Sequence, residues 1–177
     1  RWRADTAYAH GDYMQAAQLY DQLATANPDD RELIARRDKA RAGELGVELN
    51  AVQTARIAGL DAEATGELAL LLDQRDIWGG TMPEELQPGL DTEVDATASR
   101  IAAEAAAKIK AAGPLAGEDA VAHYGHLLAR ADFTKERAEI HAKIVEAGQA
   151  RRTQPVAVAA TPAWSWFAGR YCAHFGV

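Results

Sequence analysis

The sequence has very little cysteine and few aromatic residues. Its single cysteine, Cys172, excludes an internal disulfide and a zinc site built from several thiolates. No run of about 18 consecutive apolar residues occurs, so no segment is predicted to cross a membrane as a helix. Aromatic residues make up 7% of the chain, whereas hydrophobic residues, among which alanine is the most frequent, make up 48%. This composition favours closely packed helices over a sheet sandwich, and we expect little or no strand.

Basic residues are outnumbered by acidic ones. The formal net charge is −7, which excludes general nucleic-acid binding unless basic side chains gather on one face. The nearest candidate, residues 31–41, interleaves its arginines and its lysine with Glu32 and Asp38, and Glu44 follows. This pattern is typical of a solvated helix face, so we expect no nucleic-acid partner.

The motifs of several common enzyme classes are absent. The sequence has no P-loop, no GxGxxG after a strand, no GxSxG elbow and no HExxH. Cys172 and His174 are two residues apart and would point in roughly opposite directions on a helix, so they do not form a nucleophile and base pair. We therefore predict no catalytic residue, no cofactor and no enzymatic activity. The chain begins at Arg1 rather than methionine, and we expect a processed or excised product that is cytoplasmic or exported.

Residues 4–28 carry the pattern of a helix, a tight turn and a second helix. Apolar residues on the second helix recur at intervals of three and four and form one stripe, namely Ala16, Leu19, Tyr20 and Leu23. Gly11 permits the turn, and Asn27-Pro28 ends the helix. The segment resembles a tetratricopeptide repeat, with matching positions at Gly11-Asp12-Tyr13, Ala16, Tyr20, Leu23 and Pro28. Any antiparallel helix pair is the alternative interpretation.

The rest of residues 1–150 is predicted to form further helices. We expect helices from Arg31 into the forties and from Val47 to Ala58, divided at Gly43 and Gly46, because glycine weakens a helix. A helix capped by Asp61 should bury Ala64, Leu68, Leu71 and Leu72. A helix that opens at Asp91 or Thr92 and ends at Gly113 should bury Val94, Ala98, Ile101, Ala105 and Ile109. Residues 118–131 repeat the spacing of the opening motif at Ala120, Tyr124 and Leu127. A last helix from Thr134 to Gly148 should turn inward Ala138, Ile140, His141, Ile144 and Val145.

Residues 77–91 contain several glycines and prolines and are predicted to form a long loop. Trp78 precedes two glycines, and two interpretations are open. It presents an exposed aromatic anchor to a partner, or it folds back onto the face of Leu68 and Leu72. We include Trp78 among the candidate partner-binding residues.

The C-terminal segment differs from the rest of the chain. Residues 151–161 are predicted to form a linker, and residues 162–177 a short amphipathic helix or the start of a downstream segment. Its aromatic side chains share one face, namely Trp164, Phe167, Tyr171 and Phe175. The face either packs on the same chain, enters a groove of a neighbouring subunit or partner, or lies peripherally at a membrane. The four aromatics complete the candidate partner-binding residues.

Three histidines offer one possible metal site. His123 and His126 are spaced to share a side of a helix, and His141 follows nearby in sequence. Such a set binds a metal if the ligands converge, whereas separate surface histidines are the simpler interpretation.

The predicted fold class is therefore all-α, an array of antiparallel helical hairpins followed by a linker and an aromatic helix. The resemblance implies a concave surface that holds a protein or peptide partner, to which Tyr8 and His10 would contribute. The predicted function is non-enzymatic protein interaction or scaffolding. The alternatives are a structural subunit that assembles through the aromatic helix and a metal-binding protein that uses His123, His126 and His141.

Overall fold

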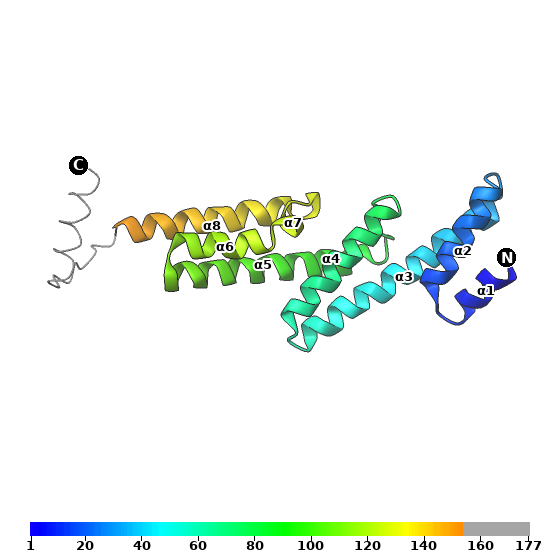
Figure 1. Ribbon diagram of the computed structural model, residues 1–177, viewed down its shortest axis with the longest axis horizontal. Coiled ribbons are helices and arrows are strands. Elements are labelled where there is room, and N and C mark those ends of the chain that lie inside the picture. The colour runs from blue at the N-terminus through cyan, green and yellow to red at the C-terminus, as the bar shows by residue number, and fades with distance from the viewer. Residues whose placement is uncertain (154–177) are drawn as a thin grey trace, which may run out of the picture.

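A computed structural model describes residues 1–153, and these residues form helices with no strand among them, which confirms the predicted all-α class. The helices in chain order are α1 (Trp2–Ala9), α2 (Tyr13–Ala26), α3 (Arg31–Ile57), α4 (Asp61–Ile77), α5 (Gln87–Ala112), α6 (Pro114–His123), α7 (Gly125–Leu128), a 3-10 turn η1 (Ala131–Phe133) and α8 (Thr134–Thr153). The molecule is elongated, with α1 and α2 at one end, α5, α6 and α8 at the other, and α3 and α4 between them (Figure 1).

The opening hairpin of α1 and α2 packs against the first half of α3 through small side chains. Gly11 adopts a positive φ of 79° at the turn, a conformation that glycine reaches without steric cost. The side chain of Asp12 then caps α2 by accepting a hydrogen bond from the backbone N–H of Gln15. We call the buried residues of this unit the hairpin cluster: Ala4, Ala7, Ala16, Ala17, Tyr20, Leu33 and Ala40. Alanine lets the helices approach closely around one large side chain, Tyr20.

The predicted break in residues 31–58 is wrong, because α3 is one continuous helix of 27 residues. Asp30 caps it through the backbone N–H groups of Glu32 and Leu33. Gly43 lies inside the helix, where a Cβ atom would be 2.8 Å from the ring of Tyr13 on α2. The glycine therefore allows two helices to approach each other and does not end one.

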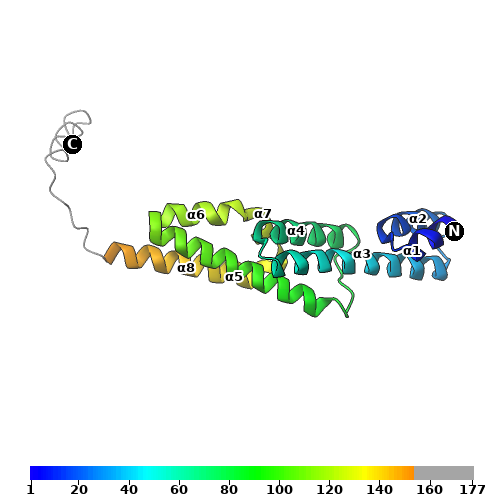
Figure 2. The same ribbon diagram turned by 90° about the horizontal axis from the view of Figure 1, so that it is seen from below.

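The second half of α3 belongs to a larger core that we call the body cluster. Its buried residues come from α3, α4, α5, α7, η1 and α8 and from the loop residue Met82: Leu45, Leu49, Val52, Leu68, Leu71, Leu72, Met82, Leu90, Val94, Ala98, Ile101, Ala102, Leu127, Leu128, Phe133 and Ile140. Every residue predicted on the inward faces of α4 and α5 is buried. In Figure 2 the long helices α5 and α8 run side by side and α6 covers α5.

The loop between α4 and α5 is shorter than the predicted 77–91, because α5 already begins at Gln87. Pro88 lies in its first turn, where the missing N–H costs no hydrogen bond. The predicted cap Asp61 is likewise the first helical residue of α4, which Leu60 precedes as N-cap. The observed starts of α4 and α5 thus differ from the predicted ones, because more than one neighbouring residue can begin a helix.

The segment that echoes the opening motif is not one helix. The structure divides it at Tyr124, which ends α6 and precedes the short α7. Ala120 and Leu127 are buried, whereas Tyr124 is half-buried, so the repeated spacing does not reproduce the single helix of the opening motif. The Gly113-Pro114 boundary is confirmed as the end of α5 and the start of α6.

Helix α8 begins at Thr134 as predicted but continues past Gly148 to Thr153. The first three residues of the predicted 151–161 linker are therefore helical. Ile140 is buried and Ile144 is half-buried in the body cluster, but the side chains predicted to accompany them inward are exposed, namely Ala138, His141 and Val145. A single helix packed mainly on one neighbour buries a narrower stripe than the prediction assumed.

Candidate protein-interaction site

A groove between α1 and α3 brings aromatic and cationic side chains together at the opening hairpin. It encloses about 310 Å³ and is lined by Tyr8, Tyr20, Arg36 and Lys39. Tyr20 of α2 is 2% exposed and lies at its base. The groove thus combines two phenol rings with two cationic side chains, and helix packing rather than a loop positions all four.

A hydrogen-bond network holds the base of the groove. The Tyr20 hydroxyl donates to Asp5 Oδ1 at 2.5 Å, and Arg36 Nη1 donates to the same oxygen at 2.5 Å. The hydrogen bond from Tyr20, with a further contribution from Arg36, lowers the pKa of the Asp5 carboxyl although desolvation opposes it. Burial and the bond to Asp5 raise the pKa of the Tyr20 phenol. Asp5 therefore stays ionised at neutral pH and neutralises Arg36.

Lys39 differs from Arg36 in its partners. Its ammonium lies over the ring of Tyr8, 5.5 Å from the centroid, in a cation–π contact. Tyr8 in turn packs edge-on against Tyr13, with ring centroids 5.2 Å apart. Among the described residues no carboxylate lies within ion-pair distance of Lys39. Its positive charge is consequently available to an incoming acidic group.

From the sequence alone, Arg36 and Lys39 could not be distinguished from the other cations of residues 31–41, which have the pattern of a solvated helix face. Arg37 and Arg41 form ion pairs with Asp21 on α2, whereas Arg36 bonds to α1 and Lys39 borders the groove. One signal was present in the sequence: Arg36 and Lys39 are three residues apart and precede the buried Ala40 by four positions and by one. That spacing places both beside the packed face of α3.

The outer face of the hairpin carries a second, wider hollow of about 640 Å³ between α1 and α2. Trp2 is 77% exposed at its edge. Polar side chains line most of it, namely Arg3, Thr6, His10, Asp12, Gln15, Gln18 and Gln22. Tyr8 and His10, which the sequence placed on one surface, therefore line two different hollows.

The remaining predicted partner-binding residues lie elsewhere or outside the described residues. Trp78 is half-buried and packs against both the hairpin cluster and the body cluster, with the Arg41 guanidinium 5.5 Å from its ring centroid. Trp78 therefore packs on the protein's own clusters and does not stand fully exposed. The four C-terminal aromatics lie outside the described residues: Trp164, Phe167, Tyr171 and Phe175.

The structure does not bring the three candidate histidines together as a metal site. His123, His126 and His141 are exposed, and the His123 ring packs edge-on against Tyr124. Within residues 1–153, no group of three or more His, Cys, Asp or Glu side chains is arranged to hold a metal ion. The geometry gives the metal-binding alternative no support.

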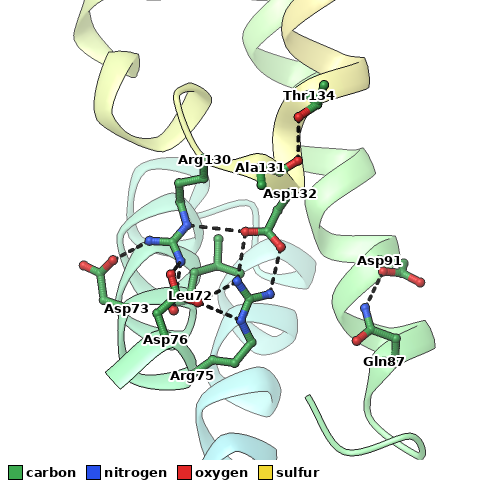
Figure 3. A network of polar contacts seen from close by, with 10 residues as sticks. All are labelled: Leu72, Asp73, Arg75, Asp76, Gln87, Asp91, Arg130, Ala131, Asp132 and Thr134. Atoms are coloured by element: carbon green, nitrogen blue, oxygen red, sulfur yellow. Dashed lines mark hydrogen bonds and ion pairs between the residues drawn. The ribbon is translucent and has the colours of Figure 1, made fainter. Parts of the chain in front are cut away.

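A network of ion pairs lies between α4 and the segment that precedes α8. Arg75 of α4 is 8% exposed and bonds to Asp132 and Asp76, while Arg130 bonds to Asp73, Asp76 and the Leu72 carbonyl oxygen. Figure 3 shows the two guanidinium groups side by side between α4 and the segment that leads into α8. The network fastens α4 to this segment, and every group in it is already paired with another.

No family model, no curated protein and no solved structure matches this chain. Among the described residues no helix is both long enough and apolar enough to cross a membrane.

Proposed function

We propose that the opening hairpin and the first half of α3 form a non-enzymatic interaction module that holds a segment of a protein partner in the α1–α3 groove. The observation that supports this most directly is Lys39, whose ammonium has an aromatic neighbour and no carboxylate partner among the described residues. Tyrosine rings give large contact area with few rotamers to restrict, which suits an interface. The tetratricopeptide resemblance of residues 4–28 points to the same class of function.

The chemistry of the groove favours a partner segment that carries an acidic side chain next to an apolar or aromatic one. The acidic group would neutralise Lys39, and the apolar group would pack on Tyr8. Arg36 is occupied by Asp5 and Glu32, so it gives the groove shape more than free charge. An exposed ammonium contributes to steering and specificity more than to raw affinity.

Site-specific crosslinking tests the proposal. A photoreactive benzoylphenylalanine at Ala35, an exposed position one turn before Lys39 on α3, is compared with the same residue at Lys143, an exposed lysine of α8 at the other end of the molecule. We expect a discrete adduct only from position 35, and the purified partner should then bind Lys39→Ala about tenfold more weakly than the unaltered protein. Lys143→Ala is the matched control. Equal adducts at both positions, or unchanged affinity of Lys39→Ala for the purified partner, would contradict the groove as the binding site.

A further inference from the structure

The hairpin cluster and the body cluster meet at a narrow joint. Among the described helices only α3 supplies buried residues to both clusters, with Ala40 in one and Leu45 in the other. Trp78, at the end of α4, packs against both. We call residues 41–48 of α3 together with Trp78 the joint. Any change in packing there alters how the opening hairpin sits relative to the rest of the molecule.

Glu48 is placed at the joint in an unfavourable setting for a charge. Its side chain is half-buried, and its Oε2 atom is inaccessible to solvent and has no hydrogen-bond partner among the described residues. An ionised carboxylate pays a desolvation cost that hydrogen bonds or a cation must offset, and Oε2 has neither. The protonated, neutral form of Glu48 avoids most of this desolvation cost.

The charged groups that act on Glu48 make its ionisation harder. They are Glu44, one turn earlier on α3, and Glu67, from α4, and both are negative. On the side of α2, Asp12 acts on Glu44. The cation two turns earlier on α3, Arg41, bonds to Asp21 and lies over Trp78. Burial first, and then the two glutamates, raise the pKa of Glu48 to about 7.

We propose that Glu48 makes the joint sensitive to pH, so that its ionisation moves α4 away from α3 and its protonation brings the two helices together. Once ionised, the carboxylate lowers its energy by gaining water and by moving away from Glu67. Glu44 lies on the same helix as Glu48, whereas Glu67 belongs to α4, so relief of the repulsion moves α4 away from α3 and from α2, which packs on α3. The inference does not depend on the proposed partner.

The direction of the pH dependence follows from proton binding. The folded protein holds the Glu48 proton more tightly than the unfolded chain, so the stability of the closed joint is greatest below the ordinary pKa of 4.5. It falls as the pH rises toward about 7 and is constant above that value. Glu48→Gln, which cannot ionise, should behave at every pH like the protonated protein.

Distances between spin labels on α2 and α4 test the proposal in the full chain. Labels are attached at Gln22→Cys and Leu70→Cys, two exposed positions, with Cys172 replaced by serine. As the pH is raised from 4.5 to 8.5, we expect the distance distribution to shift to longer values up to about pH 7 and to change little above it. In Glu48→Gln it should stay at the low-pH distribution throughout. In Glu118→Gln, which removes an exposed carboxylate of α6, the transition should be retained.

A second variant keeps the test decisive if Glu48→Gln fails to fold. Glu67→Gln removes one of the two negative neighbours, so the midpoint should move to lower pH while the transition itself persists. A merely structural role of these side chains would not shift a midpoint. A distance distribution that is independent of pH, or a transition that persists unchanged in Glu48→Gln and arises from one of the five histidines, would overturn the proposal.

Discussion

Arg75 and Asp132 are 57 residues apart in sequence and form a two-point contact, with Nη1 to Oδ1 at 2.8 Å and Nη2 to Oδ2 at 2.9 Å. The pair joins α4 to the turn that precedes α8, and parallel bonds of this kind fix orientation as well as distance. The hydrogen bond from Arg75 lowers the pKa of Asp132 although burial opposes it.

Asp132→Asn should lower the free energy of unfolding by about 1–2 kcal/mol at pH 7, a value reduced for the partial exposure of the pair. Because the folded pKa of Asp132 lies below the usual 3.8, the loss should be full above that pH and should shrink as the pH falls further. Urea unfolding at pH 7 and pH 3 measures both. Asp91→Asn, which affects only an exposed bond from Gln87, is the control (Figure 3). Equal stability of the two variants at pH 7 would argue against a role for the pair.

Gly117 on α6 packs directly on α5. A Cβ atom there would lie 2.2 Å from Cγ1 of Ile109, so something must shift. We expect Gly117→Ala to destabilise the protein by about 1–3 kcal/mol, as overpacking does. Gly66→Ala is the matched control, because nothing lies within 4 Å of its Cβ position in α4 and alanine favours a helix by about 1 kcal/mol. The melting temperature should therefore fall in Gly117→Ala and rise in Gly66→Ala.

Gly43 and Tyr13 are predicted to be coupled. Gly43→Ala alone places a methyl group 2.8 Å from the Tyr13 ring and should lower stability by about 1–3 kcal/mol. In a Tyr13→Ala background the clash is absent, so the same change should be neutral or stabilising. A double-mutant cycle from urea unfolding measures this, and an interaction energy near zero would mean that α2 and α3 do not approach as closely as described.

Glu93 is 1% exposed and accepts hydrogen bonds from Arg56 at 2.6 and 3.0 Å. Arg56→Ala should destabilise the protein, because it leaves a buried carboxylate without its cation. Adding Glu93→Gln should restore part of the loss, since a neutral amide is cheaper to bury. Melting temperatures should therefore decrease from the unaltered protein to the double variant and then to Arg56→Ala. A double variant less stable than Arg56→Ala alone would contradict this prediction.

The helix faces were predictable because they depend on local periodicity. Ala64, Leu68, Leu71 and Leu72 recur at helical intervals, and they are buried on α4 as expected. The turn at Gly11 and the helix boundary at Gly113-Pro114 were also predictable, because turns and helix caps depend on residues that are neighbours in sequence. Such predictions were wrong at the start of α5, at the break expected in α3, and on α8, which continues past Gly148 and leaves three of its predicted inward residues exposed.

The candidate site was not predictable to the same degree. Arg36 and Lys39 sit in a stretch of mixed charge that resembles any solvated face, and only the approach of α1 makes a groove beside them. The environment of Glu48 is likewise invisible in sequence, because Glu67 is brought to it by the packing of α4 on α3. Contacts between segments decide such properties, and no local pattern records them.

By itself, the sequence determined that the described residues are helical, where several helices begin or end, and which stripes are apolar, because these depend on propensity, capping and a repeat of 3.6 residues. Only the tertiary structure decided that Gly43 permits a close approach instead of a break, and that Trp78 joins two cores instead of standing exposed. It also placed Lys39 and Glu48 in settings of opposite character, one cation without a carboxylate partner among the described residues and one acid held among like charges. The physical reason is that burial and charge environment are set by helices distant in sequence.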